Sequence, residues 1–190
     1  MTRLLIVPFV CLFAVGVSAP QADLEGTTLA GAKTLADAIV WLDVSKPARA
    51  TGQAEVVLDQ KNLAFSPRVL AVQVGTVIKF PNGDRVFHNV FSFHDGQKFD
   101  LGVYPVGAVK RVPFETPGLS RIFCNIHPQM TAYVMAVETP YFAVSDASGH
   151  FVIRGVPAGS YRYHAWRAGG ALLEDSVTVG SGSALQVRWP

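Results

Sequence analysis

The segment Cys124-Asn125-Ile126-His127-Pro128-Gln129-Met130, here called the ligand loop, carries a thiol, an imidazole and a thioether at every third position. A second imidazole, that of His88, lies 36 residues before Cys124. Two histidines and one cysteine, with a methionine as a weak axial ligand, form the ligand set of a type 1 copper site. The sequence therefore predicts that His88, Cys124, His127 and Met130 bind one copper ion.

The ligand loop lies between two segments that are typical of strands. Arg121-Ile122-Phe123 precedes it, and residues 133–137 follow it with β-branched and aromatic side chains. A loop this short brings three ligands to one ion only if it curls, and Pro128 favours the curl because its φ is fixed. We expect His88 to lie on a strand over residues 86–91, so that only a folded sheet brings it to the loop. Asn89 is a candidate donor that ties the two ligand segments together.

Residues 1–22 are expected to be a secretory signal peptide. Arg3 supplies a positive charge, residues 4–17 are almost entirely apolar, and small residues follow up to Ala22. The apolar run is shorter than the roughly 20 residues that a membrane span needs. We therefore expect export, with the periplasm as the compartment, and no stable membrane insertion after cleavage. An uncleaved anchor is the alternative.

Cleavage of this leader would remove Cys11 and leave Cys124 as the one cysteine of the mature chain. A single thiol in an exported protein is either a reactive group, a metal ligand or a buried apolar side chain. The histidine and the methionine that follow Cys124 at regular spacing favour the metal ligand.

The rest of the chain predicts an all-β fold. Short alternating segments follow one another from residue 54 to residue 138, separated by turn signals such as Pro81-Asn82-Gly83-Asp84. No long window has a helical period. Short strands at this spacing are typical of a β-sandwich or barrel.

Composition excludes one class of partner. The net charge is only +2, and no basic cluster is interleaved with aromatic residues, so no nucleic acid partner is expected. The carboxylates are scattered, and no pair suits acid–base catalysis. His94, His150 and His164 have no soft donor beside them and are expected in turns or on the surface.

The ligand loop, together with Phe80-Pro81-Asn82 and His88-Asn89-Val90-Phe91, resembles the cupredoxin family, which includes plastocyanin, pseudoazurin and amicyanin. The resemblance covers about residues 54–138 and is strongest to the short Cys-x-x-His-x-x-Met loop of amicyanin. It implies a Greek-key β-sandwich, one type 1 copper and electron transfer through the exposed edge of His127. It also implies redox partner proteins, such as a dehydrogenase or a c-type cytochrome. Ile126 departs from the pattern, because such loops often carry proline there.

A second resemblance concerns the flanking segments. Residues 144–151 and 156–161 resemble carboxypeptidase-regulatory-like or transthyretin-like β-sandwiches, and residues 31–42 resemble the opening of such a domain. We therefore expect residues 23–50 and 139–190 to form one small discontinuous sandwich, with the cupredoxin-like domain of residues 54–138 inserted in it. Trp41, Trp166 and Trp189 are expected to pack this second sandwich.

Three other functions remain open at the sequence level. The same four ligands could hold Cu(I) for delivery or sensing, and a β-sandwich without metal could serve as a binding module. A nucleophilic pair of Cys124 and His127 would make the protein an enzyme, but that pair leaves Met130 and His88 without a role. An electron carrier is therefore expected rather than an enzyme.

Overall fold

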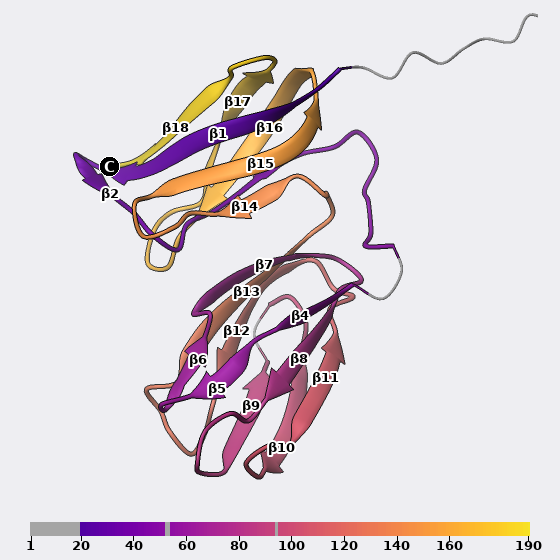
Figure 1. Cartoon of the computed structure of the whole chain (residues 1–190), viewed down its shortest axis with the longest axis vertical. Coiled ribbons are helices and arrows are strands. Elements are labelled where there is room, and N and C mark those ends of the chain that lie inside the picture. Colours follow the sequence, from indigo (N-terminus) through magenta and orange to yellow (C-terminus); the bar gives the residue numbers. More distant parts are fainter. Residues whose placement is uncertain (1–19, 52–53, 94) are drawn as a thin grey trace, which may run out of the picture.

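The computed structural model describes residues 20–51, 54–93 and 95–190 (Figure 1). Every regular element within these ranges is a β-strand, and the 18 strands form two β-sandwiches. The all-β class predicted from the sequence is confirmed. The described residues contain no helix that could cross a membrane. The leader predicted for residues 1–22 lies almost entirely outside the described ranges.

The first sandwich contains strands β4 to β13. Its larger sheet has the order β10 (Phe99–Tyr104), β9 (His88–Ser92), β12 (Gly118–Phe123), β13 (Thr131–Val137) and β7 (Val69–Gln73). The smaller sheet has the order β11 (Val109–Pro113), β8 (Val77–Pro81) and β4 (Glu55–Val57). A separate hairpin consists of β5 (Asp59–Lys61) and β6 (Ala64–Ser66).

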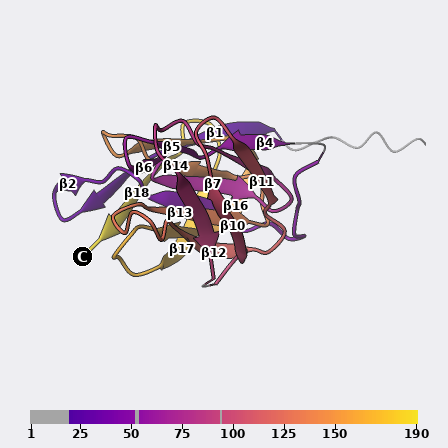
Figure 2. The ribbon, with the colours of Figure 1, turned by 90° about the horizontal axis from the view of Figure 1, so that it is seen from below.

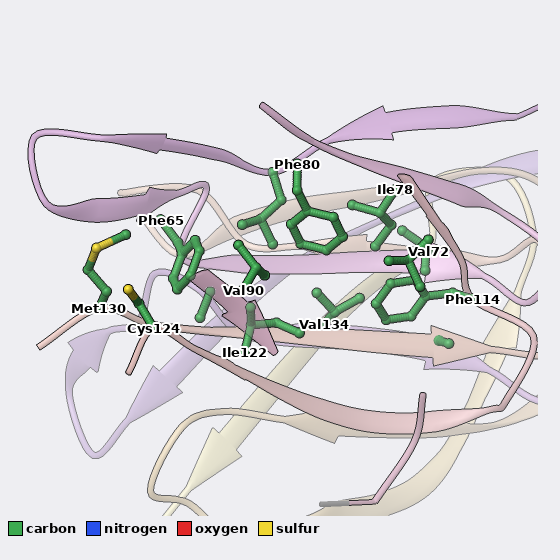
Figure 3. Packing of buried hydrophobic residues seen from close by; sticks show 14 of the residues in the cluster. Phe65, Val72, Ile78, Phe80, Val90, Phe114, Ile122, Cys124, Met130 and Val134 are labelled. Atoms are coloured by element: carbon green, nitrogen blue, oxygen red, sulfur yellow. The ribbon is translucent and has the colours of Figure 1, made fainter. Parts of the chain in front are cut away.

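The core of the first sandwich follows from alternation along these strands. Ala132, Val134 and Ala136 of β13 point into the core, while Tyr133 and Met135 belong to the opposite face, because successive side chains of a strand point to opposite sides. Figure 3 shows the core side chains in a row between the sheets, with Cys124 and Met130 at one end of the row. The metal-binding candidates thus lie at the margin of a continuous apolar core.

The second sandwich is built from the two ends of the described chain. One sheet has the order β15 (His150–Pro157), β1 (Gln21–Ala30) and β18 (Ala184–Trp189), with β2 (Lys33–Thr34) paired to β1. The other has the order β14 (Phe142–Val144), β3 (Ile39–Leu42), β16 (Gly159–Trp166) and β17 (Leu173–Val179). Strands β1 and β3 are therefore internal strands, and apart from the short β2 their neighbours come from the C-terminal segment. The chain leaves this sandwich after β3 and returns to it at β14.

The start of β1 bears on the leader boundary. Gln21 and Ala22, which the sequence analysis assigned to the signal peptide, pair with Pro157 and Val156. The Pro20 carbonyl also accepts a hydrogen bond from Ala158 N–H at 2.8 Å. The folded part of the chain thus begins two or three residues earlier than expected, because sheet pairing with β15 continues to Gln21.

The two sandwiches contact each other through apolar sheet faces. Figure 1 shows them stacked along the long axis of the molecule, and Figure 2 views the stack from below. The buried contact residues are Ile39, Val69, Ala71, Met135 and Val137. Trp41 and Trp166 also pack here, with Trp166 5.2 Å from the ring of Tyr133. These two tryptophans therefore lie between the sandwiches, and only Trp189 is part of the second core.

Candidate metal centre

Three predicted ligands from two distant segments of the chain meet at one end of the first sandwich. His88 is the first residue of β9, and Cys124 directly follows β12. Sγ of Cys124 lies 3.9 Å from Nδ1 of His88 and 3.9 Å from Nδ1 of His127, and the two Nδ1 atoms are 3.1 Å apart. Within the described ranges, no other group of three His, Cys, Asp or Glu side chains is placed to hold a metal ion.

This triangle of donor atoms has the size of a mononuclear site. The point equidistant from the three atoms lies about 2.1 Å from each of them, close to the bond lengths of about 2.0–2.1 Å to imidazole and about 2.3 Å to thiolate found at zinc sites. One ion can therefore contact all three donors without a large movement of the chain. A thiolate, two imidazoles and a nearby thioether suit copper better than zinc.

Met130 is buried beside this triangle. Met130 and Cys124 are 1% and 3% exposed and belong to the same apolar cluster, and Figure 3 shows their sulfur-bearing side chains together. Met130 N–H donates to the His127 carbonyl at 2.9 Å, which closes a β-turn with Pro128 in its second position. This turn is the curl expected for the ligand loop, and it returns the chain to the core at Met130.

His88 is fully buried and is oriented by a carboxylate. Its Nε2 atom lies 3.1 Å from Oδ2 of Asp84, so the ring donates its Nε2 proton to that oxygen. The Nδ1 lone pair then faces Cys124 and His127. Such a carboxylate behind a metal-binding histidine fixes the tautomer and the ring orientation.

Asp84 is itself held by two backbone amides. Leu63 N–H donates to Oδ2 at 2.8 Å, and Arg85 N–H donates to Oδ1 at 2.9 Å. These two hydrogen bonds, together with the smaller contribution of His88, lower the pKa of Asp84 to about 2. The carboxylate is therefore ionised under ordinary conditions and acts only as an acceptor for His88.

The loop that carries Asp84 is shaped by the buried side chain of Asn82. Its Nδ2 donates to the carbonyls of Val86 and Tyr104 at 2.9 and 3.2 Å, and its Oδ1 accepts from Asp84 N–H at 3.1 Å. Asn82 thus fixes the turn that places the carboxylate of Asp84 next to Nε2 of His88.

Asn89 joins the two ligand segments, as the sequence suggested, but as an acceptor. Its Oδ1 accepts from Asn125 N–H at 3.3 Å. Its Nδ2 donates to Oδ1 of Asp100 at 2.9 Å, which fixes the orientation of the amide. The residue after His88 is therefore hydrogen-bonded to the residue after Cys124.

The two histidines differ in exposure. His88 is 0% exposed, whereas the ring of His127 is partly open to solvent. Its loop neighbours Ile126 and Pro128 are exposed apolar residues, and the polar residues Asn125 and Gln129 beyond them are exposed as well. His127 is therefore the most exposed of the four predicted ligands.

Sequence reasoning missed Asp84 and Leu63, because Asp84 occurs in a turn signal and Leu63 acts through its backbone. Asp84 precedes His88 by four residues, and that spacing was the signal in the sequence that could have indicated the pair.

His164 is also not a simple surface residue. It stacks on Trp41 at 5.1 Å, and its nitrogens lie 2.9 Å from Asp43 and 3.3 Å from Glu174. His150 is exposed at the start of β15, and His94 lies outside the described residues.

Comparisons with known proteins give partial matches. The family model described as polysaccharide lyase family 4, domain II, matches residues 130–187, which is less than half of the chain. No curated protein matches the chain in sequence.

Several solved structures are similar to parts of the chain. A purple cupredoxin from Nitrosopumilus maritimus is 26% identical, with coverage of 44% of this chain and 99% of that chain and a TM-score of 0.39. A copper-containing nitrite reductase from Thermus scotoductus is 24% identical, with coverage of 50% and 26% and a TM-score of 0.43. A reduced mutant of amicyanin is 18% identical, with coverage of 51% and 97% and a TM-score of 0.41. These scores are low, so the interpretation of the centre rests on its own geometry.

Proposed function

We propose that the chain is an exported blue-copper protein that transfers single electrons through one type 1 copper ion. His88, Cys124 and His127 would supply the three strong ligands, and Met130 the weak axial one. The observation that carries the proposal is the triangle of Nδ1, Sγ and Nδ1 atoms with sides of 3.1, 3.9 and 3.9 Å. An electron carrier uses all four residues, whereas a nucleophilic cysteine would use two.

The bound copper would supply the Cu(II)/Cu(I) redox couple, which takes up and releases one electron. The protein residues hold the ligands in place: Asp84 and Asn89 fix the two ligand segments by hydrogen bonds, and the turn at Pro128 closes the loop. Cys124 and Met130 are shielded from water by the core. A preset ligand geometry lowers the reorganisation that each change of oxidation state requires. The partly exposed ring of His127 is the proposed path for the electron.

The proposed partners are redox proteins of the same compartment, such as a dehydrogenase or a c-type cytochrome, and the proposed compartment is the periplasm. The support is the leader-like composition of the first residues and the exposed apolar residues Ile126 and Pro128 on either side of His127. The test of export is N-terminal sequencing of the mature protein, for which cleavage before Gln21 would leave β1 intact.

The copper site is tested by the absorption spectrum of the Cu(II)-loaded protein. We expect an intense visible band from the thiolate that disappears on reduction and returns on oxidation. Cys124→Ser should abolish this band, and Met130→Leu should shift it. Met135→Leu is the matched control, because Met135 lies between the sandwiches, and its spectrum should equal that of the parent. Loss of the band in the control, or its persistence in Cys124→Ser, would contradict the assignment.

Delivery or sensing of Cu(I) is the second candidate. It is favoured by the pocket beside the centre, which is lined in part by Cys124 and gives a route for an incoming chelating group. A protein of this kind would pass Cu(I) to a chelator such as bathocuproine disulfonate within seconds and would show no reversible visible band. A carrier should keep its copper through repeated cycles of oxidation and reduction.

A further inference from the structure

The β5–β6 hairpin is attached to the turn that carries Asp84. Oδ1 of Asp59 accepts a hydrogen bond from Gly83 N–H at 3.2 Å, and Nε2 of Gln60 donates to the Pro81 carbonyl at 2.9 Å. A Cβ atom at Gly83 would lie 2.8 Å from both carboxylate oxygens of Asp59, so this close approach requires glycine. The hairpin is thus held against the turn at two points, close to where its tip meets Asp84.

The tip of the hairpin has an unusual backbone. Asn62 and Leu63 have φ angles of 55° and 57°, the left-handed conformation of a type I′ turn, in which glycine is preferred at the second position. A bulky residue is strained there, and the side chain of Leu63 is 40% exposed, so burial does not account for it. Strained residues of this kind are concentrated at functional sites.

The amide of Leu63 is directed at Asp84. It takes no part in the ladder of the hairpin, whose innermost pair is Lys61 and Ala64. It donates instead to Oδ2 of Asp84 at 2.8 Å. The left-handed turn therefore presents one backbone donor to the carboxylate that orients His88.

One carboxylate oxygen accepts both of these hydrogen bonds. Oδ2 of Asp84 lies 2.8 Å from the Leu63 nitrogen and 3.1 Å from Nε2 of His88, whereas Arg85 N–H donates to the other oxygen, Oδ1. Each hydrogen bond stabilises the negative charge of the oxygen that accepts it, so less charge remains to attract the second donor. The Leu63 amide and the His88 ring therefore compete for Oδ2.

We propose that Leu63 is a positioning residue of the metal centre, because its amide sets the strength of the hydrogen bond between Asp84 and His88. This inference rests on the proposed function. Without the amide, Oδ2 would serve His88 alone, the bond would strengthen, and the imidazole would become a more basic ligand. A more basic ligand favours Cu(II) over Cu(I). Loss of Asp84 itself should act in the opposite direction, since His88 then has no acceptor.

The first test uses the metal-free protein and removes one hydrogen-bond donor. The N–H of Leu63 is replaced by an ester oxygen, introduced as the hydroxy acid of leucine. We expect the Nε2 proton signal of His88, which is protected from exchange because the ring is fully buried, to shift downfield as its bond to Asp84 strengthens. Leu63→Gly is the matched control, because glycine keeps the N–H and adopts a positive φ without strain.

An unshifted His88 signal in the ester variant, or an equal shift in Leu63→Gly, would overturn the proposal. The ester should also have no effect in Asp84→Ala, because the coupling passes through the carboxylate. An equal effect in that background would overturn the proposal as well. In the unaltered chain, couplings across the hydrogen bonds should connect Cγ of Asp84 to both the Leu63 nitrogen and Nε2 of His88. Absence of the Leu63 coupling would contradict the shared oxygen even if the ester variant did not fold.

The second test measures the reduction potential of the copper-loaded protein. We expect the ester to lower the potential, with the preference for Cu(II) over Cu(I) rising about fivefold, the weight of one ordinary hydrogen bond. Leu63→Gly should leave the potential unchanged, and Asp84→Ala should raise it. A potential that rises in the ester variant would overturn the proposal. A downfield shift of His88 in a protein that takes up no copper would refute the proposed function but would support the role of Leu63 at His88.

Discussion

Both sandwiches consist of two packed sheets, but the histidines of the first and of the second sandwich have different neighbours. In the first, the start of β9 and the end of β12 bring His88 and Cys124 to one end of the core. In the second, His164 lies on a sheet face, where its two nitrogens meet the carboxylates of Asp43 and Glu174. A sandwich therefore gains a candidate metal centre when soft donors occupy the loops that close its end, and the layers alone do not supply one.

The sandwiches also differ in how the chain builds them. The first comes from one continuous stretch, whereas β1 and β3 of the second pair with strands more than 100 residues later. The second sandwich thus pays the entropy of closing a long loop, which the intervening first sandwich reduces by holding the loop ends together. This difference leads to four predictions.

Deletion of residues 20–50 should have the largest effect. It removes β1 and β3, the internal strands of both sheets of the second sandwich, so residues 139–190 should lose their protease resistance entirely. The first sandwich should still bind copper with its visible band, because all four predicted ligands remain. Limited proteolysis and the absorption spectrum measure the two halves of this prediction. If residues 139–190 stay resistant to protease after the deletion, their folding does not depend on residues 20–50, and the prediction is wrong.

Gly26→Ala should destabilise the second sandwich by about 1–3 kcal/mol, the usual cost of overpacking. A Cβ atom at Gly26 would lie 2.2 Å from Cζ of Phe151 and 2.6 Å from the Leu185 carbonyl oxygen. Denaturant unfolding measures the change, and the copper band should be unaffected in the folded protein. Gly180→Ala is the control, because the nearest atom to its Cβ is 4.0 Å away. Equal stability of the two variants would show that β1 is not tightly packed.

Asp84→Ala should weaken Cu(II) binding about tenfold, since loss of the partner of a metal-binding histidine typically costs 10–100-fold. Asp84→Asn should have a smaller effect, because its amide oxygen still accepts the Nε2 proton of His88. Competition with a chelator measures the affinity, and the nitrogen chemical shifts of His88 in the metal-free protein report its tautomer. An unchanged tautomer and affinity in Asp84→Ala would remove Asp84 from the centre.

The smallest effect concerns acid stability of the second sandwich. Hydrogen bonds from Ser148 Oγ and from the amides of His150 and Ser148 lower the pKa of Asp146 below its ordinary value of 3.8. Because the folded pKa is the lower one, the carboxylate contributes stability above pH 3.8 that is lost as the pH falls through the folded value. Asp146→Asn should reduce this part of the acid dependence, measured by unfolding between pH 2 and 5 (about the range of the transition). An identical pH profile would contradict the assignment.

The sequence was sufficient to predict those features that depend on residues close together in the chain. Alternating residues along the strands predicted the all-β class, which is confirmed. The spacing of Cys124, His127 and Met130 indicated the ligand loop, because the chemistry of each donor type is visible in one residue. Pro128 indicated the turn that the structure shows between His127 and Met130.

The remaining features arise from contacts between distant segments. Leu63 reaches Asp84 through its backbone N–H, and no side-chain pattern reports such a bond. Trp41 and Trp166 resemble core residues in sequence, but they cover the contact between the two sandwiches. Each lies on the strand face opposite to the second core, which holds Val40 and Leu42 of β3 and Tyr163 and Ala165 of β16. The partners of His164 lie on β17 and after β3, so only the assembled sheet brings them together.

X-ray absorption spectroscopy of the copper-loaded protein tests the central claim most directly, because it counts the atoms bound to the metal. We expect one sulfur and two imidazole nitrogens at short distance, with the sulfur absent in Cys124→Ser. A first shell made of nitrogen and oxygen alone would show that Cys124 does not bind the ion, and it would contradict the electron-carrier account.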